Sequence, residues 1–178
     1  MFVKPWESFR FCPRCGAAAT TAERLIPFRC AACEFTLFFN PVVGVAGIIR
    51  RPDGAILLLR RAKEPAKGKL GVPGGFVDFG ESAEDGLRRE AREEVGLQLD
   101  AVEFFLSFPN SYTYRDVTYG VVDFYFTARI DAHQSAQALD EVESFVWLQP
   151  AAIAPDDLAF PSLRHAIQRY REQPASSL

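Results

Sequence analysis

The sequence predicts an α+β protein with a small metal-binding module at its N-terminus. Three observations lead to this prediction. All four cysteines fall near the N-terminus, in two C-x2-C pairs. Several later runs are rich in β-branched and aromatic residues, which is typical of buried strands. Two other segments space their apolar residues three and four apart, as amphipathic helices do.

Composition places the chain among globular proteins. Its 178 residues suffice for one ordinary domain and a small appendage. Hydrophobic residues make up 48% and charged residues 24%, which excludes a largely disordered chain. The net charge of −3 gives no basic footprint, so nucleic-acid binding is not expected. No apolar run could cross a membrane and no signal-peptide core is visible, so we expect a cytoplasmic protein.

The cysteine pairs predict a zinc ribbon. Cys12 and Cys15 form the first pair, and Cys30 and Cys33 form the second. Each such turn directs two sulfurs at one tetrahedral ion, and Gly16 suits the turn of the first pair. Disulfides or a redox C-x2-C motif are the alternatives, but the chain lacks both a secretion signal and a βαβ pattern. We expect structural Zn²⁺, because so little apolar material would not fold without the metal.

The break at Asn40-Pro41 marks a domain boundary. The expected organisation is a zinc ribbon over residues 1–38, a main domain over 39–172 and a flexible tail over 173–178. Strands are predicted over residues 42–50, 55–60, 102–108, 117–130 and 144–148. Pro and Gly in Arg51–Gly54 predict the turn between the first two. Pro109 is expected to end the third strand. A last helix over 162–171 would cover the sheet with one apolar face, formed by Leu163, Ala166, Ile167 and Tyr170.

The stretch from Gly75 to Leu97 carries the clearest chemical signal. Ser82 predicts a helix N-cap and Gly96 predicts the C-terminal stop. The predicted buried stripe consists of Ala83, Leu87, Ala91 and Val95.

Three glutamates of this helix, Glu90, Glu93 and Glu94, crowd one flank, because residues three and four apart are neighbours on a helix. Glu94 also projects close to Leu87 and therefore leans toward the buried stripe. A solvated acidic face is one interpretation. The other is a site for Mg²⁺ or Mn²⁺, which prefer oxygen ligands.

The same stretch resembles the Nudix box, G-x5-E-x7-R-E-U-x-E-E-x-G-U, where U is a bulky aliphatic residue. The matching residues are Gly75, Glu81, Arg89, Glu90, Glu93, Glu94, Gly96 and Leu97. Ala91 is small for the first U position. The resemblance extends over about residues 42–170. It implies an α/β/α sandwich on a mixed sheet and hydrolysis of a nucleoside diphosphate linked to another moiety.

The resemblance also implies roles for individual residues. The implied ligands of Mg²⁺ or Mn²⁺ are Glu90, Glu93, Glu94 and the Gly74 carbonyl, with Glu81 as an auxiliary ligand or water-positioning group. Arg89 would orient the catalytic Glu93 through an ion pair. Glu141 matches an acidic loop that often supplies the general base in relatives, although a solvated loop charge is the simpler interpretation. The implied reaction is attack of a metal-activated water on one phosphorus.

The expected substrate is a nucleotide of the ADP-ribose, FAD or NADH class, with release of AMP. NADH pyrophosphatases also place a zinc ribbon before a Nudix domain, but only Phe108-Pro109-x-Ser111 of their signature is present here. A group acting on ADP-ribose or FAD shares features like Asn40-Pro41 and Leu158-Ala-Phe160, and its similarity is better. A house-cleaning pyrophosphatase for nucleoside triphosphates and a nucleotide-sensing regulator are the alternatives. The intact box speaks against the regulator.

Aromatic residues near a predicted turn at Arg115-Asp116 are candidates for substrate contacts. The candidates are Tyr112, Tyr114, Arg115 and Tyr119. Strand packing is the ordinary interpretation; the functional one is stacking on a base and contact of Arg115 with a phosphate. Residues 60–69 carry five cations, as a solvated loop or an electropositive rim. A homodimer is compatible with the resemblance, because Nudix relatives are often homodimers.

Overall fold

The computed structural model describes residues 3–20, 27–131, 133–140 and 142–173. It divides into two compact units. One consists of Met1–Val42 with Ser111–Val121, and the other of Val43–Asn110 with Val122–Leu178. The N-terminal segment therefore shares its unit with a stretch from the middle of the chain. The predicted tail lies, from residue 174 onward, outside the described residues.

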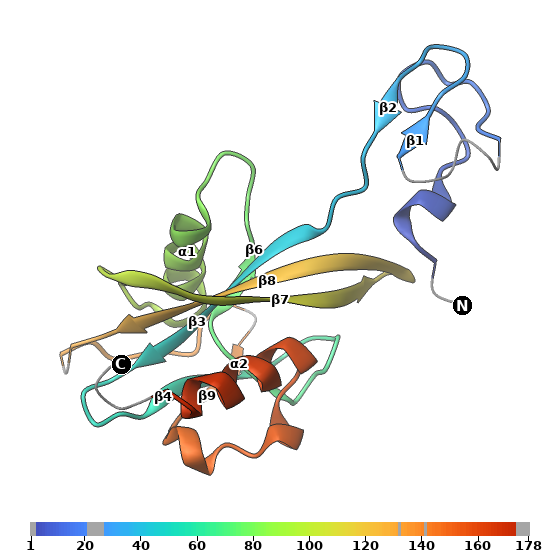
Figure 1. Ribbon diagram of the computed structural model, residues 1–178. Helices are drawn as coiled ribbons and strands as arrows, with labels where there is room; N and C mark the ends of the chain where they lie inside the picture. Colours follow the sequence, from blue (N-terminus) through green and yellow to red (C-terminus); the bar gives the residue numbers. More distant parts are fainter. Residues whose placement is uncertain (1–2, 21–26, 132, 141, 174–178) are drawn as a thin grey trace. The chain divides into compact units, whose positions relative to one another are not determined.

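The order of elements matches an α+β protein (Figure 1). The elements of the described residues are η1 (Pro5–Ser8), β1 (Phe28–Arg29), β2 (Thr36–Leu37), β3 (Val42–Arg50), β4 (Ile56–Arg61), β5 (Leu70–Gly71), β6 (Gly74–Phe76), α1 (Ala83–Val95), β7 (Val102–Tyr114), β8 (Val117–Arg129), β9 (Val142–Leu148), η2 (Pro150–Ala152), η3 (Pro155–Asp157) and α2 (Pro161–Arg171). None of these helices is long and apolar enough to cross a membrane.

A seven-stranded sheet forms the framework of the larger unit. Its main path is β5-β4-β3-β8-β7, with β6 on β3 and β9 on β4. Strand β6 is antiparallel to β3 and places Gly75 opposite Val45. Strand β9 is antiparallel to β4 and places Leu148 opposite Ile56. The sheet thus brings the Gly-rich segment to a central strand.

Helices α1 and α2 cover opposite faces of this sheet (Figure 1). Strand β4 is buried on both sides: Leu57 and Leu59 join the core under α1, whereas Ile56 and Leu58 join the core under α2. The helices contribute Leu87, Ala91 and Val95 from α1, and Leu163, Ala166, Ile167 and Tyr170 from α2. The predicted buried faces are confirmed, and the layers form the expected α/β/α sandwich.

Local signals set the ends of α1 as predicted. The Ser82 hydroxyl accepts a hydrogen bond from the Asp85 backbone N–H at 3.1 Å. Gly96 takes a left-handed conformation with φ of +70°, and its N–H donates to the Arg92 carbonyl at 3.0 Å. A residue with a side chain resists that conformation, which explains the glycine.

The prediction that Pro109 ends its strand is wrong. Strand β7 continues through Pro109 to Tyr114. It lies at one end of the sheet path, where an outer edge leaves room for a residue without an N–H donor. The predicted turn at Arg115-Asp116 is confirmed, with φ of +45° and +67°. Positive φ at both central residues suits the twist of a tight hairpin.

We predict that Gly96→Ala lowers the free energy of unfolding by about 1 kcal/mol, because alanine resists positive φ. Gly120→Ala is the matched control. Gly120 lies in β8, and an added Cβ would meet no atom within 4 Å. Its replacement should be neutral or slightly stabilising. Denaturant unfolding measures both, and equal effects would contradict the helix-capping role of Gly96.

Candidate functional site

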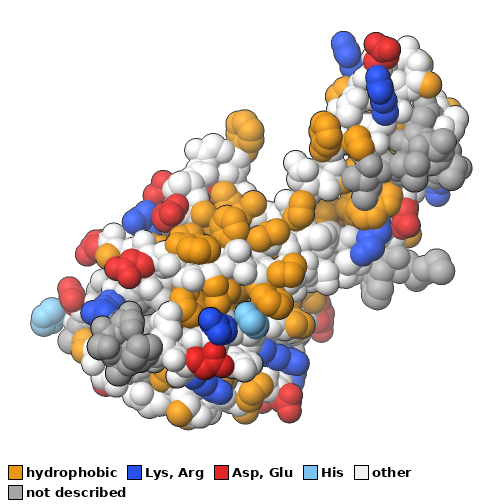
Figure 2. Space-filling view, viewed as in Figure 1, with side chains coloured by type: hydrophobic (Ala, Val, Ile, Leu, Met, Phe, Trp, Pro, Cys, Tyr) orange, Lys and Arg blue, Asp and Glu red, His pale blue; other side chains and the backbone are white. Residues whose placement is uncertain are grey.

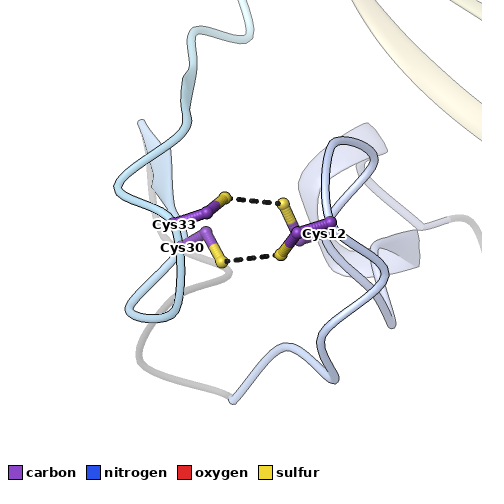
Figure 3. A group of neighbouring side chains, drawn as sticks. Cys12, Cys30 and Cys33 are labelled. Atoms are coloured by element: carbon purple, nitrogen blue, oxygen red, sulfur yellow. Dashed lines mark hydrogen bonds between the residues drawn. The ribbon is translucent and has the colours of Figure 1, made fainter.

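The four predicted zinc cysteines come together in the structure. Their sulfurs all lie within 4.8 Å of one another. Cys12 Sγ lies 3.7 Å from Cys33 Sγ, and Cys15 Sγ lies 3.7 Å from Cys30 Sγ (Figure 3). A disulfide would need about 2.05 Å. Tetrahedral Zn–S bonds of about 2.3 Å separate sulfurs by about 3.8 Å. The spacing therefore fits one tetrahedral Zn²⁺ and excludes disulfides.

The two knuckles are built alike. In the first, the Gly16 N–H donates to the Cys12 carbonyl at 2.9 Å, and in the second the Glu34 N–H donates to the Cys30 carbonyl at the same distance. Gly16 and Glu34 both have positive φ, of +75° and +58°. The turn signal at Gly16 was visible in the sequence. The equivalent at Glu34 was not, because glutamate rarely takes this conformation.

The predicted substrate residues belong to the same unit as the cysteines. The tip of the β7–β8 hairpin bonds to the N-terminal segment: the Val3 N–H donates to the Asp116 carbonyl at 3.1 Å, and the Thr118 N–H donates to the Val3 carbonyl at 2.9 Å. The Arg115 guanidinium lies 5.3 Å from the centre of the Tyr114 ring. Of the candidates, Tyr112 and Tyr119 are half-buried, whereas Tyr114 and Arg115 are exposed.

In the larger unit, two adjacent glycines bring a loop against α1. A Cβ on Gly74 would lie 2.1 Å from the Val45 carbonyl oxygen, so the backbone of β3 permits only glycine there. A Cβ on Gly75 would lie 2.2 Å from Glu90 Oε1. The Glu90 carboxylate therefore lies directly over Gly75. Glycine at both positions therefore lets the loop lie close to Val45 of β3 and to Glu90 of α1.

Arg89 connects the acidic side chains of the box. Its guanidinium contacts Glu81 Oε1 at 2.8 Å, Glu90 Oε1 at 2.8 Å and Glu93 Oε2 at 3.2 Å. It also donates to the Phe76 carbonyl at 3.0 Å. The sequence predicted only the pair with Glu93. Arg89 instead joins the loop before α1 to three carboxylates.

Glu94 takes a separate position. It is half-buried, and its Oε2 accepts a hydrogen bond from the Gly74 N–H at 3.0 Å. This agrees with the predicted lean toward the buried stripe. Glu93, by contrast, leaves 55% of its side chain exposed. The Gly74 backbone therefore contacts Glu94, whereas Arg89 contacts the predicted ligands Glu90 and Glu93.

Burial and hydrogen bonding shift the pKa values of this cluster in opposite directions. Hydrogen bonds from Arg89 hold the pKa of Glu81 below its usual range. Burial raises the pKa of Glu90 despite its contact with Arg89. The hydrogen bond with Glu81 raises the pKa of Arg89. Glu90 is thus a carboxylate whose negative charge is costly to bury without a further cation.

The donor set has the chemistry of a hard-cation site. Glu90, Glu93, Glu94 and the Gly74 carbonyl offer oxygen alone, which suits Mg²⁺ or Mn²⁺. Among the described residues, only the cysteines bring three or more acidic, thiol or imidazole ligand atoms within 4.8 Å of one another. The carboxylates instead spread around Arg89 and Gly74. The chemistry of these residues fits the ion.

The loop before β9 lies on the end of α1. Its Gln137 and Leu139 N–H groups donate to the Val95 and Glu94 carbonyls, each at 3.0 Å. Glu141, the predicted general base, lies outside the described residues. Asp78 was not singled out in the sequence; its carboxylate lies 3.8 Å from Arg89.

Three of the five cations in the loop over residues 60–69 donate to backbone carbonyls. Arg60 donates to the Gly68 carbonyl at 2.6 Å, and Arg61 donates to the Pro65 carbonyl at 2.8 Å. Lys69 donates to the carbonyl of Asp156 at 2.8 Å. These contacts order the loop. They favour the ordinary interpretation over a phosphate-attracting rim.

We predict that protein purified without chelators contains about one zinc ion per chain. Cys15→Ser should lose the metal, because one of four thiolate ligands is removed. Ala32→Ser is the matched control: it is exposed in the second knuckle and should retain zinc. Elemental analysis measures all three proteins. Zinc-free protein from a chelator-free preparation would refute the four-thiolate site.

Known proteins resemble this chain in sequence. The family model described as "NUDIX domain" matches residues 40–170. An "ADP-ribose pyrophosphatase" of Methanocaldococcus jannaschii is 45% identical over 64 residues, which is 36% of this chain and 37% of that protein. A "NAD-capped RNA hydrolase NudC" of Chromobacterium violaceum is 26% identical over 175 residues, 94% of this chain and 62% of that protein. The matches thus span less than two thirds of these relatives.

Solved structures support the same fold. A NUDIX hydrolase from Nitrosomonas europaea aligns with a TM-score of 0.63 at 24% identity, covering 94% of this chain and 96% of that one. The NUDIX domain of Shewanella oneidensis NrtR, complexed with ADP ribose, aligns with a TM-score of 0.62 at 24% identity, covering 76% and 91%. Together with the family match over most of the sequence, these findings show that the chain belongs to the Nudix family.

Proposed function

We propose that the chain hydrolyses the pyrophosphate bond of a nucleoside diphosphate linked to a second moiety. The substrate class is that of ADP-ribose, FAD or NADH, and AMP is a product. The observation that carries this proposal is the cluster around Arg89, in which Glu81, Glu90 and Glu93 are held against the Gly-rich loop. A surface helix with a merely solvated acidic face would not need such a cluster.

In this proposal, the ligands of Mg²⁺ or Mn²⁺ are Glu90, Glu93, Glu94 and the Gly74 carbonyl, with Glu81 as an auxiliary group. The metal would activate water and neutralise charge on the phosphate oxygens. Arg89 would fix the carboxylates before substrate arrives. Its bond to the Phe76 carbonyl would also hold the loop in place. Such prior positioning lowers the cost of assembling the site.

The names of the relatives agree with this class of reaction. They include the ADP-ribose pyrophosphatase described above and a human "NAD(P)H pyrophosphatase NUDT13, mitochondrial", 30% identical over 101 residues. Both names describe cleavage of a nucleotide pyrophosphate. We extend the proposal to base contacts by Tyr112, Tyr114 and Tyr119, phosphate contact by Arg115, and proton transfer by Glu141.

We predict AMP release from at least one of ADP-ribose, FAD, NADH and a diadenosine polyphosphate in the presence of Mg²⁺. Nucleoside triphosphates belong in the same panel, because their preference would favour the house-cleaning alternative. Product identification by chromatography measures the outcome. Tight binding of one compound without cleavage of any would contradict the hydrolase proposal and favour a nucleotide-sensing regulator.

Within this test, Glu93→Gln should lower the rate by about 100-fold or more, because a neutral amide is a poor ligand for a hard cation. Glu84→Gln is the control. Glu84 lies in the first turn of the same helix, at one of the variable positions between Glu81 and Arg89, and its replacement should leave the rate nearly unchanged. Full activity of the Glu93 variant would remove that residue from the metal site.

A further inference from the structure

Burial divides the four sulfurs of the zinc ribbon into two kinds. Cys12 and Cys30 are buried, each with 3% of its surface exposed. Cys15 is exposed and Cys33 is half-buried. The reactivity of a cysteine with a dissolved reagent depends on its access to solvent. Such a reagent therefore meets Cys15 first and Cys33 next.

The closest sulfur contacts pair one accessible cysteine with one buried cysteine. Cys15 Sγ lies 3.7 Å from Cys30 Sγ, and Cys33 Sγ lies 3.7 Å from Cys12 Sγ. Both pairs run from one knuckle to the other (Figure 3). Cysteines that respond to oxidants are typically accessible and lie beside a second thiol that completes a disulfide. Each accessible cysteine of this ribbon has such a partner in the opposite knuckle.

Disulfides in these two pairs would connect the same segments that the metal connects. An ion bound by all four sulfurs joins the first knuckle to the second. Bonds from Cys15 to Cys30 and from Cys12 to Cys33 would also join them, whereas bonds inside each knuckle would leave the knuckles unconnected. The apolar cluster at this place is small, and its buried members are Cys12, Phe28 and Cys30. Only the bonds between knuckles could therefore replace the metal as a support for the fold.

We propose that the zinc ribbon is a peroxide-reactive site, in which oxidation joins Cys15 to Cys30 and releases zinc while the ribbon stays folded. A second round of the same reaction joins Cys33 to Cys12. A reducing compartment would return the thiols and restore the metal site. The proposal concerns the smaller unit and does not depend on the proposed hydrolysis.

The reaction takes two steps with hydrogen peroxide. The Cys15 thiolate attacks one peroxide oxygen, so that an S–O bond forms, the O–O bond breaks and hydroxide leaves. The Cys30 thiolate then attacks the Cys15 sulfur, so that the S–S bond forms, the S–O bond breaks and a second hydroxide leaves. The two thiolates lose two electrons, which the peroxide gains, and the solvent protonates both hydroxides.

The first disulfide removes two of the four zinc ligands, because the thiolate is the form that binds the metal. Cys12 and Cys33 alone do not complete a tetrahedral thiolate site. Zinc is therefore lost as the Cys15–Cys30 bond forms, so metal release and disulfide formation should proceed together.

Trp6 reports whether the ribbon stays folded. Its ring centre lies 6.1 Å from that of Phe39, which lies 5.1 Å from that of Phe9. The Phe9 ring lies 5.8 Å from that of Phe28, which is buried beside the cysteines. The chain has two tryptophans, so Trp147→Phe leaves Trp6 as the only one. Its emission then follows the packing of this aromatic cluster.

Hydrogen peroxide added to the zinc-loaded full chain tests the proposal. We expect release of about one zinc ion per chain, measured with a chromogenic chelator. A sulfenic-acid reagent present from the start should label Cys15 about fivefold or more above Cys12 or Cys30. Peptide mapping by mass spectrometry should find Cys15 linked to Cys30. Ala32→Ser, which changes an exposed residue of the second knuckle, is the matched control and should react as the parent does.

Two comparisons separate the folded reaction from general thiol oxidation. The oxidised, zinc-free chain should keep the Trp6 emission of the zinc-loaded chain, whereas reduced chain stripped by a chelator should emit at longer wavelength. Chain oxidised in guanidinium chloride should form mostly bonds within each knuckle, because the shortest loops cost least to close. Bonds within knuckles in the folded chain, first labelling of another cysteine, a shifted Trp6 emission after oxidation, or retention of zinc at millimolar peroxide would each overturn the proposal.

Discussion

The contact of one guanidinium with several carboxylates is the interaction on which the candidate site depends. Carboxylates that crowd one flank of a helix repel each other, and the burial of Glu90 adds a desolvation cost. Arg89 offsets both effects and also bonds to the carbonyl of Phe76. The helix and the loop are therefore fixed by the same group. Gly74 and Gly75 permit this close approach, because a side chain at either position would meet Val45 or Glu90.

The smaller unit depends on a second constraint. Its four sulfurs have the spacing of tetrahedral zinc ligands, and its apolar core is small. The same unit includes the hairpin tip that bonds to Val3 on both sides. Exposed hydrophobic side chains occur in both units (Figure 2); the largest exposures include Phe11 and Phe38 in the smaller unit and Phe79 in the larger one.

Features set by neighbouring residues could be predicted from the sequence. The caps at Ser82 and Gly96, the cysteine knuckles and the buried faces of both helices all depend on spacing along the chain. The continuation of β7 through Pro109 could not be predicted, because it depends on which strand lies at the edge. The bond from Lys69 to the Asp156 carbonyl joins residues 87 positions apart, so it could not be predicted from either segment alone.

The candidate site shows the same division. The acidic residues of the box were visible as a motif, whereas the contacts of Arg89 with Glu81 and Phe76 required the fold. Side-chain chemistry along one helix could be predicted from the sequence; the meeting of distant segments could not.

The Arg89→Lys variant tests the central role of this guanidinium most directly. Lysine keeps the positive charge but lacks the planar fork that contacts several acceptors at once. Comparing its pyrophosphatase rate with that of the parent, alongside circular dichroism to confirm folding, separates positioning from charge. If the planar fork positions the carboxylates, the variant folds and its rate falls by roughly 10–100-fold. A folded variant with the rate of the parent would contradict it.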